Sequence, residues 1–181
     1  AYPDFIFKSL HQVHGNSVVE TNLSSLNDRE ADAHWTYEKN TALMIKSADC
    51  MPILAYDSLN SRAIAIHAGW RGVQKQIISL ALANSSNAKI FIGPHIGINS
   101  FEVQSDCLDL LKECTKLPPE QWFQNSHVDL YKIVLSQLED VSISTVDIHH
   151  LPFDTKSDLR FHSFRRDASS AGRQNSFISL L

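Results

Sequence analysis

Three short segments of this 181-residue chain place an imidazole or a thiol among small and polar residues, a setting that a plain hydrophobic core does not require. They are HQVHGN at 11–16, SADCMP at 47–52 and HAGWRG at 67–72. Imidazole nitrogen and thiolate sulfur are good ligands for zinc, and a cysteine beside a histidine can also act as a nucleophile. A histidine at the end of a strand can equally be structural, so each segment alone leaves both interpretations open.

The strands expected around the last two segments bring Cys50 and His67 together. Apolar runs typical of strands lie at 42–46, 52–56 and 63–67. The polar sequence DSLNSR between the last two predicts a hairpin turn, which sets position 52 opposite His67. Cys50 then points to the same face as a diagonal neighbour, about 7–8 Å away at the backbone. A metal with ligand bonds of about 2.0–2.3 Å could bridge the two side chains, although a register slip of one residue would turn one of them away.

The remaining patterns predict a mixture of strands and helices around these segments. Residues 21–40 are polar and loop-like. Helices are expected at 73–83, at 105–114 with Ser105 as the capping residue, and at 127–139, and further strands at 89–92, 145–149, 161–164 and 176–180. There is no repeat or linker, so we expect residues 1–181 to form a single α/β (α+β-like) domain with mixed β-sheets flanked by helices.

The composition is that of a soluble globular protein. The chain is 43% hydrophobic and 20% charged, with a net charge of -4, which gives no electrostatic reason to expect nucleic acid or a membrane as partner. The odd set of three cysteines (Cys50, Cys107 and Cys114) suits a reducing compartment, and we read no signal peptide. Cys107 and Cys114 lie seven residues apart on one predicted helix face, as core residues do. We therefore expect a cytoplasmic protein, monomeric or weakly dimeric, that acts on a small molecule.

Five motifs in order make the sequence resemble a known family. They are QVHGNSVV, SADCMPIL, IAIHAGWRGV, IGPHIGINSFEV and SFRRD followed by GRQ, and together they resemble the YfiH/laccase-domain family. Members of that family are described as polyphenol oxidases or as purine nucleoside phosphorylases with adenosine deaminase activity. The resemblance implies a layered fold similar to putative cysteine hydrolases. It also implies that His14, Cys50 and His67 are the metal-binding catalytic residues, with zinc the usual metal.

The sequence departs from the family pattern in three places. Members usually carry an arginine and a glycine-rich stretch before the QVHG motif, and we expect this chain to lack that segment. The family motif GPxIGxCCYEV reads GPHIGINSFEV, so His95 is new and the two cysteines are absent. His149 and His150 stand where the family usually has Cys-Thr. The three unexpected histidines are either additional site residues or ordinary core and surface residues.

The function that the resemblance implies is that of a zinc-dependent purine nucleoside enzyme, acting by adenosine deamination, phosphorolysis or both. Trp70 and Phe101 are candidates for the wall against a flat base, and Asp49 is a candidate acid or base, or a residue that caps a turn. Arg71 and Arg173 are expected to hold ribose or phosphate oxygens, with Arg165 and Arg166 also available, unless they form structural ion pairs. The family's early arginine would help to hold the phosphate, and we expect this chain to lack it. We therefore expect deamination to be favoured over phosphorolysis.

Three other interpretations remain open from the sequence. The first is a copper-dependent polyphenol oxidase with copper in a Cys-His₂ site. The multicopper type needs about ten histidines in HxH pairs, whereas this chain has nine histidines and no such pair. Cys50 could instead be a nucleophile activated by His67 in a hydrolase. A binding module stabilised by a metal would need a fourth ligand, for which His11 or His95 is available.

Overall fold

The computed structural model describes residues 5–85, 87–144 and 147–181. Its largest sheet is mixed and has six strands. Its strands are β3 (Val18–Glu20), β5 (Ala33–Thr36), β7 (Met51–Asp57), β8 (Arg62–Ala68), β9 (Ala88–Ile92) and β12 (Ile148–His150). They lie in the order β12-β9-β7-β8-β5-β3. The outermost pair on each side is parallel and the three central pairs are antiparallel.

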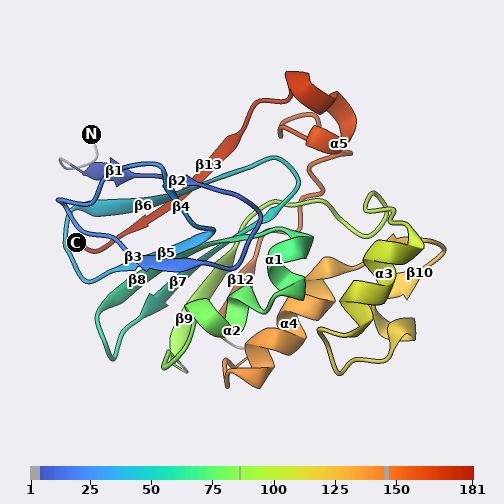
Figure 1. Ribbon diagram of the computed structural model, residues 1–181, viewed down its shortest axis with the longest axis horizontal. Helices are drawn as coiled ribbons and strands as arrows, with labels where there is room; N and C mark the ends of the chain where they lie inside the picture. Colours follow the sequence, from blue (N-terminus) through green and yellow to red (C-terminus); the bar gives the residue numbers. More distant parts are fainter. Residues whose placement is uncertain (1–4, 86, 145–146) are drawn as a thin grey trace.

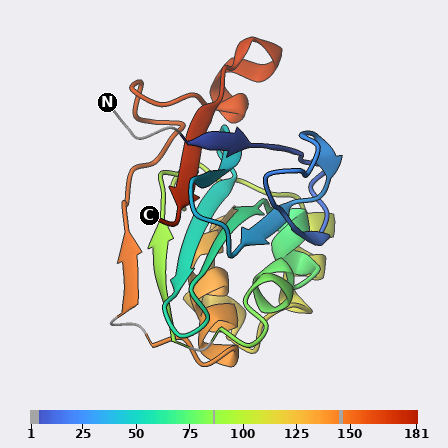
Figure 2. The same cartoon turned by 90° about the vertical axis from the view of Figure 1, so that its left-hand side faces the viewer.

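A smaller sheet covers one face of this sheet (Figures 1 and 2). It consists of β1 (Ile6–Lys8), β6 (Thr41–Ser47) and β13 (Gln174–Ser179), with β6 in the middle. Leu43 and Ile45 of β6 are buried with Ala63 and Ala65 of β8 between the two sheets. Two short ladders complete the strands: β2 (Leu10–His11) with β4 (Arg29–Glu30), and β10 (Phe123–Gln124) with β11 (His127–Val128).

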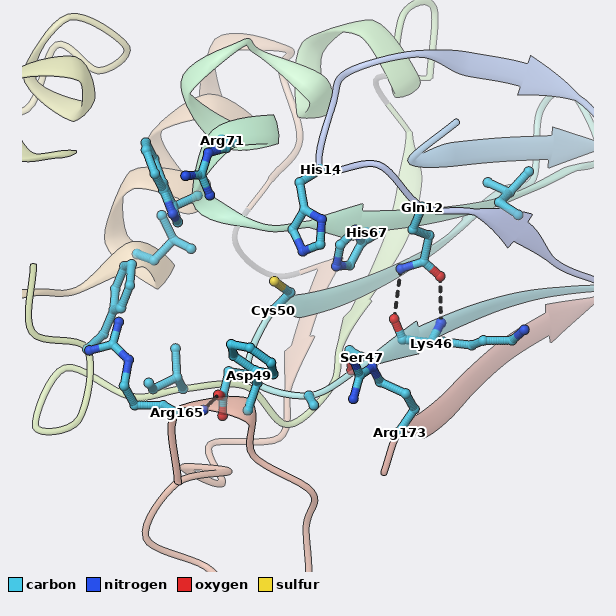
Figure 3. A pocket seen from close by; sticks show the side chains of 17 residues that line it. Gln12, His14, Lys46, Ser47, Asp49, Cys50, His67, Arg71, Arg165 and Arg173 are labelled. Atoms are coloured by element: carbon cyan, nitrogen blue, oxygen red, sulfur yellow. Dashed lines mark hydrogen bonds between the residues drawn. The ribbon is translucent and has the colours of Figure 1, made fainter. Parts of the chain in front are cut away.

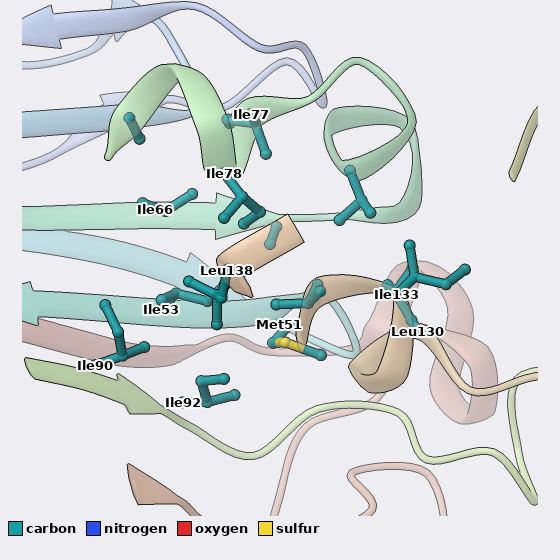
Figure 4. Close-up of a cluster of buried hydrophobic side chains, with 14 of the residues drawn as sticks. Met51, Ile53, Ile66, Ile77, Ile78, Ile90, Ile92, Leu130, Ile133 and Leu138 are labelled. Atoms are coloured by element: carbon teal, nitrogen blue, oxygen red, sulfur yellow. The ribbon is translucent and has the colours of Figure 1, made fainter. Parts of the chain in front are cut away.

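Helices pack against the other face of the six-stranded sheet, where the main core lies (Figures 1 and 4). The helices on this face are α1 (Trp70–Gln74), α2 (Ile77–Ala81) and α4 (Leu130–Asp140), and α3 (Ser105–Lys112) packs against α1. The 3-10 turn η1 (Pro119–Gln121) lies between α3 and α4 in the chain. Helix α5 (Phe164–Asp167) and the 3-10 turn η3 (Ala168–Ser170) pack on each other away from this face (Figure 1). Met51 and Ile53 of β7 lie in this core in one buried cluster with Ile133 and Leu138 of α4 (Figure 4). Burying side chains of this size stabilises the fold by about 1.5–3 kcal/mol each.

The predicted hairpin is confirmed. β7 and β8 pair antiparallel with Pro52 opposite His67, the register that the sequence argument assumed. His67 alternates with Ile66, which faces the helices, so its side chain points to the opposite face of the sheet.

The prediction of a loop over 21–40 is wrong in its second half. β4 and β5 lie within this range, and β5 is an interior strand of the six-stranded sheet, between β3 and β8. Its sequence is mostly polar or aromatic, yet Ala33, His34 and Thr36 are all buried because both faces of the sheet are covered here.

Several predicted element bounds also need correction. The helix expected at 73–83 begins earlier, at Trp70, and is divided at Gln76, which has a left-handed backbone (φ 64°). The N-cap of α3 is Gln104 and not Ser105, and the strand expected at 161–164 is absent because Phe164 begins α5. The strands expected at 89–92 and 176–180 are confirmed as β9 and β13, while part of the one expected at 145–149 lies outside the described residues.

The fold is therefore of the predicted class, with mixed sheets and helices packed in layers. Among the described residues, none of the helices combines the length and apolarity needed to span a bilayer.

Candidate metal centre

Three possible metal ligands from distant parts of the chain converge at one end of the sheets (Figure 3). A ligand atom of His14, one of Cys50 and one of His67 all lie within 4.8 Å of one another. His67 is buried, Cys50 half-buried and His14 exposed. The donor set of one thiolate and two imidazoles is one that zinc or copper accepts, so the residues present fit such an ion.

The elements explain how these side chains meet. β6 belongs to the small sheet and β7 to the large one, so the segment 48–50 crosses from one sheet to the other and presents Cys50 at the crossing. The crossing is sharp, since Asp49 has a left-handed backbone (φ 88°). His14 lies in the loop between β2 and β3 and also has a positive φ of 58°. The tight turn therefore falls on His14 itself, and Gly15, the glycine that follows it, has no positive φ.

A buried carboxylate that the sequence analysis missed connects two of the three ligands. Asp32, which is 0% exposed, accepts a hydrogen bond from Nδ1 of His67 at 2.8 Å and one from the backbone N–H of His14 at 2.9 Å. The only signal in the sequence is a lone acidic residue between two alanines, in ADAHWT, inside a stretch taken for a loop.

The electrostatics of the centre favour a charged pair in the absence of metal. Burial would raise the pKa of Cys50, but hydrogen bonds from His14 and His67 lower it to about 6. Burial would lower the pKa of His67, but its bonds to Asp32 and Cys50 raise it to about 9. Near neutral pH the metal-free centre thus holds a thiolate beside an imidazolium.

This charge state leads to a measurable prediction for the metal-free protein. We expect iodoacetamide to alkylate Cys50 at nearly the same rate at pH 8 and pH 7, because the thiolate is lost only as the pH falls through about 6. Cys107 and Cys114, whose pKa values burial raises to about 11, serve as internal controls and should stay largely unmodified. Mass spectrometry of the alkylated peptides measures the rates. A roughly tenfold drop at Cys50 between pH 8 and pH 7 would show an ordinary thiol.

Two glycines allow the elements around the centre to approach closely. A Cβ on Gly69 would lie 3.0 Å from Sγ of Cys50 and 3.3 Å from Cδ2 of His14. A Cβ on Gly72, in the first turns of α1, would lie 2.8 Å from the carbonyl oxygen of Gly15. The HAGWRG segment thus ends β8, begins α1 and packs against the loop that carries His14.

The three ligands open onto a cavity of about 480 Å³, which is large enough for a small organic molecule (Figure 3). Its apolar walls come from several elements: Leu10, Trp70, Ile96, Phe101, Leu130 and Phe164. Polar side chains complete the lining, and among them are Arg71, Arg165 and Arg173. The predicted substrate-binding residues Trp70, Arg71 and Arg173 therefore do lie together around the three ligands.

The arginines at and near the cavity differ in the partners that their guanidinium groups already have. The guanidinium of Arg71 stacks over Trp70 at 4.4 Å, and Nη1 of Arg173 donates to the carbonyl oxygens of Ala171 and Gly172. Nη1 of Arg165 donates to the carbonyl oxygen of Glu102 at 2.8 Å. Arg166 is absent from the cavity lining, since it pairs with Asp167 and binds three backbone carbonyls.

Asp49 lines the cavity with both carboxylate oxygens already engaged. Oδ1 accepts from the hydroxyl of Thr155 at 2.8 Å, and Oδ2 accepts from the backbone N–H of Arg165 at 2.6 Å. The second bond connects the crossing segment to α5 and fits the interpretation of Asp49 as a residue that caps a backbone amide.

The sequence matches one protein-family model over nearly its whole length. The family model described as "Multi-copper polyphenol oxidoreductase laccase" matches residues 3–181. This chain belongs to that laccase-like family. Together with the three converging ligands, membership indicates a metal at this centre, without deciding between zinc and copper.

Curated members of the family carry the name of a nucleoside enzyme. The purine nucleoside phosphorylase YfiH of Escherichia coli is 28% identical over 179 residues, covering 95% of this chain and 73% of the relative. A purine nucleoside phosphorylase of Clostridium acetobutylicum is 29% identical over 157 residues, and the match spans 82% of this chain and 66% of the relative. The crystal structure of YlmD from Geobacillus stearothermophilus superposes with a TM-score of 0.85 at 26% identity, covering 96% of this chain and 73% of that chain. The resemblance to YfiH is thus confirmed.

The histidines in which this member departs from the family pattern do not join the three ligands. Nδ1 of His95 donates to the carbonyl oxygen of Ile96, so its Nε2 accepts from Nε2 of His150 at 3.0 Å. His150 stacks on Tyr131 at 4.0 Å, and His149 stacks on Phe91 at 5.1 Å. Within the described residues, the cluster of possible metal ligands has three members, and neither His11 nor His95 is a fourth.

Proposed function

We propose that this chain is a zinc-dependent purine nucleoside enzyme in which His14, Cys50 and His67 hold the metal. The observation that carries the proposal is the opening of these three ligands onto a cavity with aromatic walls and three arginines. Three protein ligands leave a coordination position for water or substrate, which is the pattern of catalytic and not structural zinc. The names of the relatives support purine nucleosides as the substrate class.

Each part of the cavity has a task in this proposal. Zinc, when bound, supplies a Lewis acid that activates water near neutral pH. Trp70 and Phe101 offer flat apolar surfaces against which a purine base can lie. The guanidinium groups of Arg71, Arg165 and Arg173 bind the oxygen atoms of the ribose or of a phosphate ion.

We expect deamination to be the stronger of the two candidate reactions. It requires water and a pocket for one organic molecule, whereas phosphorolysis also requires an anion fixed beside the ribose by several donors. Arg165 and Arg173 each have one Nη already bonded to backbone carbonyls, so their forks are only partly free for such an anion.

Incubation of adenosine with the metal-loaded protein tests this ranking. Chromatography should show inosine as the main product, at a rate that phosphate leaves nearly unchanged. Release of adenine that depends on phosphate, with no inosine, would reverse the ranking, and guanosine with phosphate provides a second substrate for phosphorolysis. If no purine nucleoside is converted, the proposed function is wrong.

The family description keeps copper-dependent phenol oxidation as a second candidate. A multicopper oxidase needs a separate cluster of several copper ions, and the described residues form a single group of three possible ligands. Metal analysis of protein purified without added metal separates the candidates: about one zinc per chain supports the nucleoside enzyme, and copper supports the oxidase. A metal-free protein with an alkylation-sensitive activity would support Cys50 as a nucleophile.

A further inference from the structure

The carboxylate of Asp32 receives four hydrogen bonds, two at each oxygen. Oδ1 accepts from Nδ1 of His67 at 2.8 Å and from the backbone N–H of His14 at 2.9 Å. Oδ2 accepts from the backbone N–H of Gly15 at 2.6 Å and of Val13 at 3.2 Å. The backbone of Asp32 is bound as well, since its carbonyl oxygen accepts from the N–H of His67 at 2.7 Å. This side chain therefore connects segments that are 53 positions apart in the sequence.

The bond to His67 decides which ring nitrogen faces the centre. A carboxylate only accepts hydrogen bonds, so Nδ1 of His67 carries the proton and Nε2 is the atom that faces Cys50 and His14. A carboxylate behind a ligating histidine fixes the orientation of its ring and strengthens its nitrogen as a ligand.

The bonds to the backbone hold His14 in an unfavourable conformation. A residue other than glycine at φ 58° costs about 1–2 kcal/mol, and the conformation persists only where the surroundings enforce it. Three consecutive N–H groups, those of residues 13–15, point at one carboxylate and fix the loop in this shape.

We infer that Asp32 is a positioning residue for the metal centre, which fixes the ring of His67 and the loop of His14 at the same time. This inference rests on the proposed metal centre. Asp32 lies behind the ligands, and its role is to align two of the three donors before the metal binds, so that binding does not have to pay for their ordering.

The test compares zinc affinity in Asp32→Asn with that of the natural chain. Asparagine keeps the size of the side chain but puts an NH₂ group where one oxygen accepted two hydrogen bonds, so two donors lose their partner. We expect zinc affinity, measured by competition with a chromophoric chelator, to fall about 10–100-fold. The absorption spectrum of the cobalt-substituted protein should change as well, because the positions of the histidine ligands change.

Asp57→Asn is the matched control. Asp57 is also a buried carboxylate that accepts several hydrogen bonds, from Asn60 and Ser85, but it lies at the far end of β7 from Cys50. The Asp57→Asn substitution should lower the stability of the fold while leaving zinc affinity and the cobalt spectrum unchanged.

The outcomes separate the two proposals. If the natural chain binds zinc and Asp32→Asn binds it equally well, the role of Asp32 is wrong and the metal centre stands. If the natural chain binds no zinc or cobalt, the metal centre itself is wrong, and the inference falls with it. Should Asp32→Asn fail to fold, nitrogen NMR of the zinc-loaded natural chain decides: a proton on Nδ1 of His67 supports the inference, and zinc bound at Nδ1 overturns it.

Discussion

Replacing Cys50 by alanine is expected to abolish metal binding and nucleoside turnover together. Cys50 supplies the only sulfur of the cluster, and its loss leaves two imidazoles where catalytic zinc sites use three protein ligands. We expect the metal content to fall from about one ion per chain to near zero, and turnover to fall by at least about 10³-fold. Elemental analysis and the adenosine assay on the same preparation measure both.

Cys107→Ala and Cys114→Ala are the controls for this change. Both cysteines are buried in the main core, away from the cavity ligands, and Sγ of Cys114 donates to the carbonyl oxygen of Leu111. Their replacement removes a small side chain from the core, which lowers stability by about 1 kcal/mol but leaves the metal in place. Full metal occupancy in Cys50→Ala would contradict the assignment of this residue as a ligand.

The second large effect is expected from Gly72→Ala, which should weaken metal binding by displacing the loop that carries His14. Its Cβ would lie 2.8 Å from the carbonyl oxygen of Gly15, a backbone atom that moves only if the loop of His14 moves. Alanine in a helix is otherwise favoured over glycine by about 1 kcal/mol, so propensity alone predicts a gain in stability. We expect the contact to outweigh this gain, with about tenfold weaker zinc binding and a lower melting temperature.

Gly15→Ala provides the comparison within the same contact. A Cβ on Gly15 would meet its nearest neighbours, Asp32 and Val13, at 3.4 and 3.6 Å, which is ordinary van der Waals distance, and its φ is not positive. We therefore expect Gly15→Ala to bind zinc almost normally, although Gly15 directly follows His14. Equal zinc affinity in Gly72→Ala and the natural chain would show that α1 adjusts without moving His14.

The local patterns of the sequence were sufficient to predict the hairpin and the proximity of Cys50 to His67. Alternation of apolar residues has a period of two in a strand, and the polar turn fixes where the chain reverses, so the pairing of Pro52 with His67 follows from neighbours in sequence. The addition of His14, by contrast, came from the resemblance of ordered motifs and not from any local pattern.

Only the tertiary structure shows the hydrogen bonds of Asp32 and the break in the first helix. Asp32 lies 18 positions from His14 and 35 from His67, and nothing in its immediate sequence shows that it will accept their N–H groups. The chain leaves the helical path at Gln76, whose side chain donates to the carbonyl oxygen of Cys114, 38 positions away. Both features depend on hydrogen bonds between segments that folding brings together, and a buried polar group can be assigned its partner only once the surrounding elements are in place.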